Sequence, residues 1–181
     1  MARVFAYGSL LNPRELLREG VDPGGCRPAR VSGYRLAFDK RSRRRCAAAN
    51  LEPCNGCTVA GIVCEADSRA LERLDEREVA YQRVLVYASP LGGGEALEAH
   101  AYMSSERLDA SGLERCLGDG RLQEYLRVIA WGLAHWERVA SGFARLYLSS
   151  IRRDRVHERI LGELERLLEA AYTAPGAPAP R

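Results

Sequence analysis

Three carboxylates, Asp75, Glu76 and Glu78, lie where a predicted helix gives way to a predicted strand. A general base works best where burial raises its pKa and a fixed neighbour orients it, and a helix-to-strand junction beside a sheet can provide both. The same carboxylates could instead form exposed ion pairs with the arginines around them, which contribute little to stability. Taken without further information, the residues favour the ion pairs.

A second candidate site is the turn at residues 7–10, here named loop 7–10, which ends an apolar run and precedes an Asn-Pro-Arg-Glu helix start. A small-residue turn after a strand can present several backbone N–H groups to one anion. The loop could therefore bind a carboxylate or phosphate, although a ligand-free turn between strand and helix would read the same. Its residues are Tyr7, Gly8, Ser9 and Leu10.

Ser9 could act as a nucleophile only with a base beside it. The three histidines, His100, His135 and His157, are all remote from Ser9 in the sequence, and the chain has no Gly-x-Ser-x-Gly motif. A hydroxyl that contacts a ligand is the better interpretation of Ser9.

Six cysteines raise the question of a metal site. Cys54 and Cys57 form a Cys-x-x-Cys pair, and Cys46 with Cys64 could complete four zinc ligands. A second Cys-x-x-Cys pair is missing, so a local disulfide or free buried thiols are favoured over zinc. We predict no metal and no cofactor.

Hydrophobic periodicity predicts an α+β fold. Five strand-like runs occupy residues 3–7, 30–38, 58–64, 83–87 and 97–103, with short helices at 13–18 and 68–74 and helical spacing after residue 109. The expected architecture is a small mixed β-barrel or strongly curled sheet with flanking helices and a helical C-terminal third. We expect one domain at 1–172, with the barrel at about 1–106, a helical extension at about 109–172, and a disordered Ala/Pro tail at 173–181.

Composition excludes some functions. A net charge of +3 is too small to indicate nucleic acid, and the basic run at residues 40–45 lacks interleaved aromatic residues. No apolar run reaches the roughly 20 residues that span a bilayer, and the N-terminus lacks a signal-peptide pattern. We therefore expect a cytoplasmic protein that binds neither nucleic acid nor membrane.

Five blocks, taken in order, resemble the γ-glutamylcyclotransferase-like family over roughly residues 3–104. They are Tyr-Gly-Ser-Leu at 7–10, Gly-Tyr-Arg-Leu-x-Phe at 33–38, Ala-Asn-Leu-x-Pro at 49–53 followed by Gly56, Val-x-Gly-Ile-Val at 59–63, and Leu-Asp-x-x-Glu-x-x-Tyr-x-Arg at 74–83. Each block alone is weak, but the ordered set is specific. Farther along, Tyr125 and Gly132 are similar to the family's C-terminal Tyr…Gly helix.

The resemblance implies a small β-barrel in which loop 7–10 holds a γ-glutamyl group and Glu78 is the acid/base, with Asp75 and Glu76 outside the catalytic position. It also favours a functional role for Tyr81, which could orient Glu78 by a hydrogen bond and is expected among the substrate-binding residues. Asn50 lies in a matching block and could contact the ligand, although a turn-forming asparagine is an equal alternative.

The activity implied by the resemblance is cleavage of a γ-glutamyl amide, in which the substrate's own α-amine attacks its γ-carbonyl to give 5-oxoproline and a free amine. A module that only binds a γ-glutamyl or other acidic metabolite is the alternative. The leaving amine stays open; an arginine of the basic run could bind a carboxylate on it, although a solvated loop is at least as good an interpretation. The long C-terminal helices could cover the site or form a homodimer, with core packing as the default.

Overall fold

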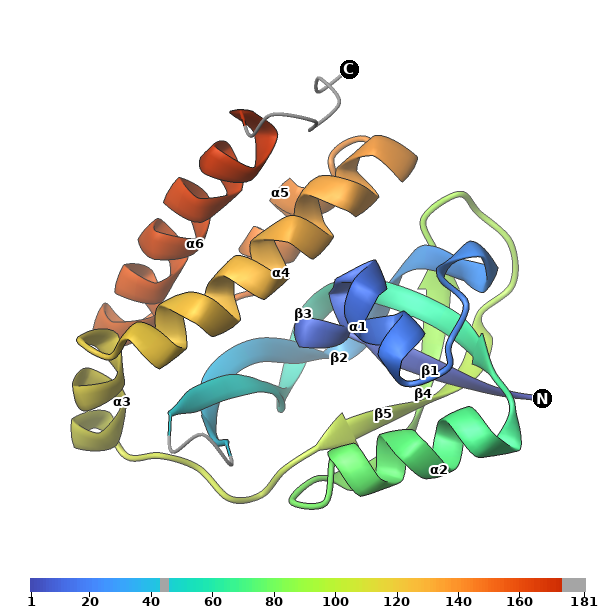
Figure 1. Ribbon diagram of the computed structural model, residues 1–181, viewed down its shortest axis with the longest axis horizontal. Coiled ribbons are helices and arrows are strands. Elements are labelled where there is room, and N and C mark those ends of the chain that lie inside the picture. The colour runs from blue at the N-terminus through green and yellow to red at the C-terminus, as the bar shows by residue number, and fades with distance from the viewer. Residues whose placement is uncertain (43–45, 174–181) are drawn as a thin grey trace.

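The computed structural model describes residues 1–42 and 46–173, and its centre is a closed five-stranded barrel (Figure 1). The strands follow one another around the barrel in the order β1-β3-β2-β4-β5. Their bounds are β1 Ala2–Ala6, β2 Cys26–Arg41, β3 Ala47–Ala66, β4 Gln82–Pro90 and β5 Leu97–Met103. β1 pairs parallel to β5 and antiparallel to β3, which confirms the predicted mixed barrel.

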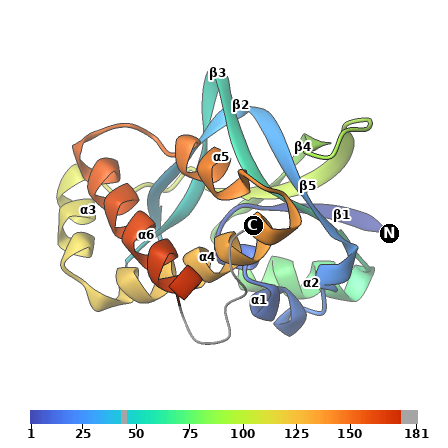
Figure 2. The same cartoon turned by 90° about the horizontal axis from the view of Figure 1, so that it is seen from above.

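The hairpin of β2 and β3 is longer than predicted and bends sharply, as Figure 2 shows. Ser32 pairs with Thr58 and Tyr34 pairs with Pro53. The four residues 54–57 of β3 therefore lie opposite the single residue Gly33 of β2 and form a bulge. Gly33 has φ +88° and Gly56 φ +76°, conformations that suit glycine. The Cys-x-x-Cys pair therefore lies in a bulge within β3, because both flanks of the pair stay hydrogen-bonded to β2.

Two short helices and two 3-10 turns connect the first strands of the barrel. The 3-10 turn η1 (Ser9–Leu11) leads into α1 (Pro13–Arg18), where the Asn12 side chain accepts a hydrogen bond from Arg14 N, as predicted for an N-cap. A second 3-10 turn, η2 (Pro23–Gly25), precedes β2. Helix α2 (Ser68–Arg77) is one turn longer than predicted, and its extension places Glu78 at its C-cap.

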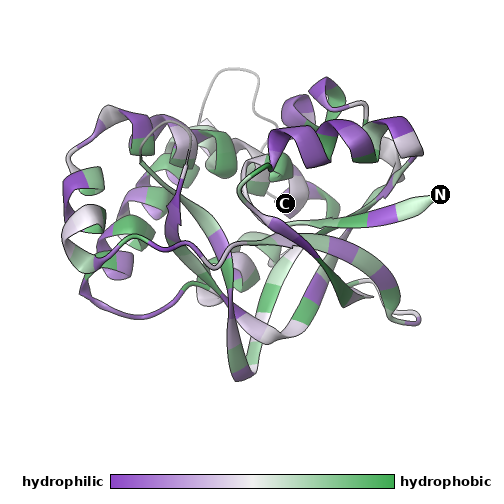
Figure 3. Cartoon of the chain, turned by 90° about the horizontal axis from the view of Figure 1, so that it is seen from below, coloured by the Kyte–Doolittle hydropathy of each residue, from purple (hydrophilic) through white to green (hydrophobic). Residues whose placement is uncertain are grey.

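Four helices follow the barrel, as predicted for the C-terminal third (Figures 1 and 2). Hydrophobic and hydrophilic residues alternate along them (Figure 3), and most of their apolar residues pack into the core, whereas Trp131, Val139 and Leu146 are exposed. Trp136 donates its indole N–H to Leu11 O at 2.8 Å, and Tyr147 donates its hydroxyl to Tyr7 O at 2.8 Å. The helices are α3 (Ala110–Leu117), α4 (Gly120–Val139), α5 (Phe143–Ser149) and α6 (Arg155–Thr173).

The predicted tail at 173–181 lies outside the described residues except for Thr173, which ends α6. Among the helices at 1–42 and 46–173, none is both long and apolar enough to cross a bilayer.

The cysteines form two disulfides, Cys26–Cys64 and Cys54–Cys57, and leave Cys46 and Cys116 as buried thiols. Cys64 is therefore paired across the hairpin and not with the Cys-x-x-Cys pair. Within the part of the chain that the structure describes, no cluster of three or more His, Cys, Asp or Glu side chains could hold a metal. Burial, together with a hydrogen bond to Cys116, raises the pKa of Cys46 to about 12, so its thiol is neutral at pH 7.

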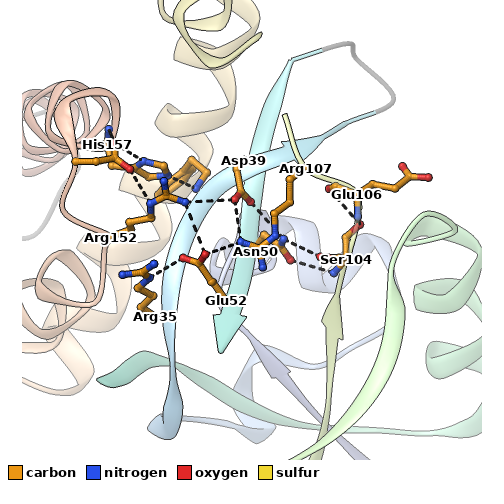
Figure 4. A network of polar contacts seen from close by, with 11 residues as sticks. Arg35, Asp39, Asn50, Glu52, Ser104, Glu106, Arg107, Arg152 and His157 are labelled. Carbon is orange, nitrogen blue, oxygen red and sulfur yellow. Dashed lines mark hydrogen bonds and ion pairs between the residues drawn. The ribbon is translucent and has the colours of Figure 1, made fainter. Parts of the chain in front are cut away.

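A polar network ties the hairpin to the C-terminal helices (Figure 4). The fully buried ring of His157 accepts a hydrogen bond from Phe38 N at 3.0 Å and contacts Asp154 Oδ1 through Nδ1 at 2.9 Å. Asp154 also accepts hydrogen bonds from Val156 N and His157 N at the start of α6. One carboxylate therefore fixes both the helix end and the histidine tautomer.

Replacing Asp154 with Ala should lower the free energy of unfolding by about 1–2 kcal/mol at pH 7, the range of a lost helix cap. Burial alone would raise the pKa of Asp154, but hydrogen bonds from His157 and the charge of Arg152 lower it to about 2. A lowered carboxylate pKa stabilises the fold above the unfolded pKa, near 4, and this contribution is lost as the pH falls toward 2. Urea denaturation should therefore show the difference in unfolding free energy between wild type and Asp154→Ala shrinking over pH 4 to 2.

Asp109→Ala is the control, because it removes the cap of α3 but no histidine contact. It should lower the free energy of unfolding by less than Asp154→Ala does. An equal loss would contradict the role of His157.

Candidate functional site

A cavity of about 590 Å³ opens where η1, α1, the end of α2, β3 and α4 meet. Its wall combines backbone and side chains of loop 7–10 with charged groups from four elements, α1, β2, α2 and α4, and with several aromatic side chains. The charged lining residues are Glu15, Arg18, Glu19, Lys40, Arg77, Glu78 and Arg121.

Glu78 is the one member of the carboxylate cluster at residues 75–78 that lines this cavity. Its backbone N–H ends α2 by donating to Leu74 O at 2.9 Å, and its side chain is 19% exposed. Burial raises the pKa of Glu78 above its ordinary value; the charge of Arg77 opposes this shift, and Glu19 adds to it. Glu78 is therefore a stronger base than an exposed glutamate.

Asp75 and Glu76 lie outside the cavity. Asp75 is 45% exposed and accepts hydrogen bonds from Tyr102 Oη at 2.7 Å and Arg83 at 2.9 Å, and Glu76 is exposed. The ion-pair interpretation of the cluster therefore fits Asp75, while Glu78 lines the cavity.

Arg77 is a cavity residue that the sequence analysis counted only among the flanking arginines. It donates to Ser9 Oγ at 3.0 Å, to Glu19 at 2.6 Å and to Glu15 at 3.1 Å, and its Nε lies 3.4 Å from Glu78. These contacts join α2 to η1 and α1. The spacing of Glu15 and Glu19, one helical turn apart and facing the same way, is the signal that could have found this partner.

Loop 7–10 is fixed by its neighbours at several points. Tyr7 donates its hydroxyl to Tyr102 O, and Leu10 is buried. A Cβ atom on Gly8 would lie 3.0 Å from Tyr125 Oη and 3.4 Å from Ala49 Cβ, so the loop and α4 are in close contact there. Ser9 Oγ accepts from Arg77, and no histidine among the described residues lines the cavity, an arrangement unlike a nucleophile with its base.

Four tyrosines, Tyr7, Tyr81, Tyr102 and Tyr125, surround the cavity. Tyr81 Oη donates to Ala49 O at 2.8 Å, so the expected hydrogen bond from Tyr81 to the Glu78 carboxylate is wrong; only its backbone N–H contacts Glu78, at the carbonyl oxygen, at 2.7 Å. Burial raises the pKa of Tyr125 to about 12, so its phenol stays neutral and accepts from Ala49 N at 3.0 Å. The sequence analysis did not identify Tyr102 as a site residue.

Asn50 is not part of the cavity wall. It is fully buried, its side chain donates to Ser104 O at 3.0 Å and to Asp39 at 3.3 Å, and its Oδ1 accepts from Ser104 N at 3.0 Å (Figure 4). The expected ligand contact is therefore corrected: all its polar atoms bind protein groups because Asn50 joins β3 to the segment after β5. The alternative, a turn-forming asparagine, is also wrong, because Asn50 lies within β3.

Within its described part, residues 40–42, the basic run contributes a lysine to the cavity, and the one arginine of that part, Arg41, does not line it. Lys40 and Ser42 line the wall, whereas the side chain of Arg41 is exposed; residues 43–45 lie outside the described residues. Lys40 is the chain's only lysine, its side chain is 2% exposed, and its Nζ lies 5.2 Å from the centre of the Tyr81 ring. A buried cation thus faces the same cavity as Glu78.

The arrangement can move a proton at Glu78 beside a ligand that carries both charges, since both cations and carboxylates line the wall. It needs no metal for that chemistry.

Solved structures of similar fold come from proteins of low sequence identity. A protein described as a gamma-glutamyl cyclotransferase shares 17% identity, with a TM-score of 0.61 over 93% of this chain and 98% of that one. An uncharacterized protein from Homo sapiens, loc79017, shares 20% identity, with a TM-score of 0.59 over 89% of this chain and 98% of that one. YkqA from Bacillus subtilis shares 19% identity, with a TM-score of 0.59 over 84% of this chain and 56% of that one.

Those structures are evidence for the fold alone. No curated protein matches the chain. The sequence itself decides the family. The family model described as gamma-glutamyl cyclotransferase, AIG2-like, matches residues 4–122, a segment that includes loop 7–10, Lys40, Arg77 and Glu78. With the barrel and this match together, the chain belongs to the gamma-glutamyl cyclotransferase, AIG2-like family.

Proposed function

We propose that this protein is a lyase that cyclises a γ-glutamyl amide to 5-oxoproline and releases the free amine. Glu78 is the acid/base, and loop 7–10 holds the γ-glutamyl group. The observation that carries the proposal is the position of Glu78: a buried carboxylate with a raised pKa, in a 590 Å³ cavity that it shares with loop 7–10.

In the proposed reaction Glu78 takes a proton from the substrate's α-ammonium group. The freed amine attacks the γ-carbonyl carbon of the same molecule, a new C–N bond closes the five-membered ring, and the amide C–N bond breaks. Glu78 passes this proton, and then the second proton that the ring nitrogen loses as it becomes an amide, to the departing nitrogen, which leaves as an ammonium group, so one carboxylate serves every transfer and no water is consumed. The reaction has no covalent enzyme intermediate and requires no cofactor.

The wall supports the folded substrate that this reaction requires. We assign the α-carboxylate to the backbone N–H groups of Gly8, Ser9 and Leu10, with Arg77 beside them through its hydrogen bond to Ser9 Oγ. Binding holds the substrate in a curled conformation that is rare in solution. This can lower the barrier to ring closure by several kcal/mol. Tyr7, which is buried, and Tyr81, which is partly buried, would pack against the ligand and exclude water.

A binding module for an acidic metabolite is the alternative. It fits the charged wall, but a zwitterion gains little from a buried carboxylate whose pKa is raised, so this feature favours the enzyme. We expect the protein in the cytoplasm, and a homodimer through its C-terminal helices stays a prediction.

The test is 5-oxoproline release from a panel of γ-glutamyl amides, measured by mass spectrometry together with the released amine. The expected result is 5-oxoproline and amine in equal amounts, with none from the matched α-glutamyl dipeptides, which lack the γ-amide. Release of glutamate would indicate hydrolysis and contradict the mechanism. Tight γ-glutamyl binding without any release would favour the binding module.

A further inference from the structure

We infer that Glu19 and Glu15 are positioning residues for the proposed acid/base: they hold the guanidinium group of Arg77 so that it does not close on the Glu78 carboxylate, which stays free to exchange a proton. The inference rests on the proposed function and adds two carboxylates of α1 and its C-cap to it. It begins from one cluster, in which a single guanidinium group lies among three carboxylates of the cavity wall.

The guanidinium group of Arg77 directs its two terminal nitrogens toward α1 and loop 7–10. Nη1 donates to Glu19 at 2.6 Å, and Nη2 donates to Glu15 at 3.1 Å and to Ser9 Oγ at 3.0 Å. Glu78 Oε1 lies 3.4 Å from Nε, farther from the guanidinium group than either of the other two carboxylates. Both terminal nitrogens are therefore occupied, and Glu78 has only a long contact with Nε.

Glu19 has an unfavourable place for which Arg77 compensates. It is the C-cap of α1, where the carbonyl groups of the helix end already carry partial negative charge. Its side chain is 17% exposed, and in the described part of the chain its ion pair is with Arg77 alone. Glu15 differs, because it also pairs with the exposed Arg18. Of the two carboxylates, Glu19 is therefore the one that depends on Arg77 for its charge partner.

Without these partners the guanidinium group of Arg77 would be free to bind Glu78. An opposite charge within about 4–6 Å lowers the pKa of a carboxyl group by about 1–3 units, which makes the carboxylate a weaker base. In the observed arrangement burial raises the pKa of Glu78, the charge of Arg77 opposes this rise, and the charge of Glu19 adds to it. Neutralising Glu19 therefore lowers the pKa of Glu78 in two ways, because it removes a repulsion and releases Arg77.

The other groups around Glu78 keep their charge states in this comparison. Lys40 of β2 also lowers the pKa of Glu78, and Arg18 and Arg121 line the same cavity from α1 and α4. Burial raises the pKa of the four tyrosines that face Glu78, so their phenols are neutral at physiological pH. These are Tyr7 after β1, Tyr81 before β4, Tyr102 of β5 and Tyr125 of α4. The charges that change between the variants below are thus those of Glu19 and Arg77.

The test is the pH profile of kcat/KM for 5-oxoproline release from one γ-glutamyl amide, in wild type and Glu19→Gln. Activity should rise with pH as Glu78 loses its proton, and Glu19→Gln should move this rise to lower pH by about one unit, the lower end of the effect of a neighbouring charge. Glutamine keeps the size of the side chain but binds Nη1 more weakly than a carboxylate does. The kcat of Glu19→Gln on the plateau should fall by less than about tenfold, as expected for a slightly weaker base. The control is Glu72→Gln, which neutralises an exposed carboxylate of α2 and should leave the profile in place.

A double-mutant cycle separates the action through Arg77 from direct repulsion between Glu19 and Glu78. Arg77→Met alone should move the rise in kcat/KM to higher pH, because the cation that favours the charged form of Glu78 is gone. In that background Glu19→Gln should move the profile by less than about half as much as it does with Arg77 present. Arg77→Lys takes the place of Arg77→Met if that variant does not fold, since an ammonium group has no planar fork that could close on Glu78.

Three results would overturn the inference: no move to lower pH in Glu19→Gln, an equal move in Glu72→Gln, or a full effect of Glu19→Gln without Arg77, which would leave Glu19 acting by repulsion alone. Failure of the proposed function looks different, because no variant would then release 5-oxoproline. In that case an NMR titration of the Glu78 carboxyl carbon, assigned by its loss in Glu78→Gln, decides. A lower pKa of Glu78 in Glu19→Gln supports the positioning role, and an unchanged or higher one overturns it.

Discussion

Glu78→Gln is expected to lower kcat for 5-oxoproline release by at least about a hundredfold, the scale of a lost general acid/base. Glutamine keeps the size of the side chain and can still hydrogen-bond, but it cannot take the α-ammonium proton or return it to the leaving amine. KM should change little, because the carboxylate is proposed to act on the proton and not to hold the substrate. Initial rates over a range of substrate concentrations separate the two effects.

Glu76→Gln is the matched control, since it makes the same chemical change two residues away, outside the cavity. It should retain wild-type kcat. Comparable losses of kcat in both variants would show that activity depends on the helix end and not on the carboxylate of Glu78. Wild-type turnover by Glu78→Gln would remove Glu78 from the mechanism.

The same substitution should stabilise the fold at neutral pH. Because burial raises the folded-state pKa of Glu78, folding favours its protonated form, and wild type loses stability as the pH rises from the unfolded pKa through the folded one. Glutamine does not titrate, so the Tm advantage of Glu78→Gln should be absent near pH 4 and grow toward pH 7. A variant that is more stable but inactive would show that its loss of activity is not a loss of folding.

The barrel could be predicted because its strands carry local signals. The apolar runs and the glycines between them gave five strands, and helical spacing gave the C-terminal third. The bend at Gly33 could not be predicted, since residues 54–57 read as a loop when the pairing of β2 with β3 is unknown. The register between two strands depends on residues that are far apart in the sequence, so the sequence of one strand alone does not determine it.

The candidate site likewise contains residues that could be predicted from the sequence and residues that could not. Glu78 and loop 7–10 were found through short motifs, and the structure brings both to one cavity. Asn50 was misread because its partner Ser104 is 54 residues away. Arg77 was counted only among the flanking arginines, since its contacts depend on how α2 packs against α1, and the cavity position of Lys40 depends on the path of the hairpin. The letters around Asn50, Arg77 and Lys40 do not name their tertiary partners; for Arg77 the only signal lies in α1, in the spacing of Glu15 and Glu19.

Gly132→Ala is expected to destabilise the protein by about 1–3 kcal/mol, the cost of overpacking a well-filled core. A methyl group there would lie 2.5 Å from the carbonyl carbon of Leu11 and 2.8 Å from Asn12 N, both backbone atoms that cannot rotate away. Gly162→Ala is the control: it lies in α6 with no atom within 4 Å of the added methyl, so it should stabilise by about 0.5–1 kcal/mol through helix propensity. Urea denaturation measures both, and equal effects would contradict close packing at Gly132.

Gly132→Ala should also lower activity at temperatures where the variant is still folded. Relief of the clash requires α4 to move away from η1, and these two elements carry Tyr125 and Ser9 on facing parts of the cavity wall. A separation of a few tenths of an ångström would loosen the contact between Gly8 and the Tyr125 hydroxyl, so the loop would hold the curled substrate less well and KM should rise. Full activity in a destabilised Gly132→Ala would mean that loop 7–10 is positioned from α2 through Arg77 and not from α4.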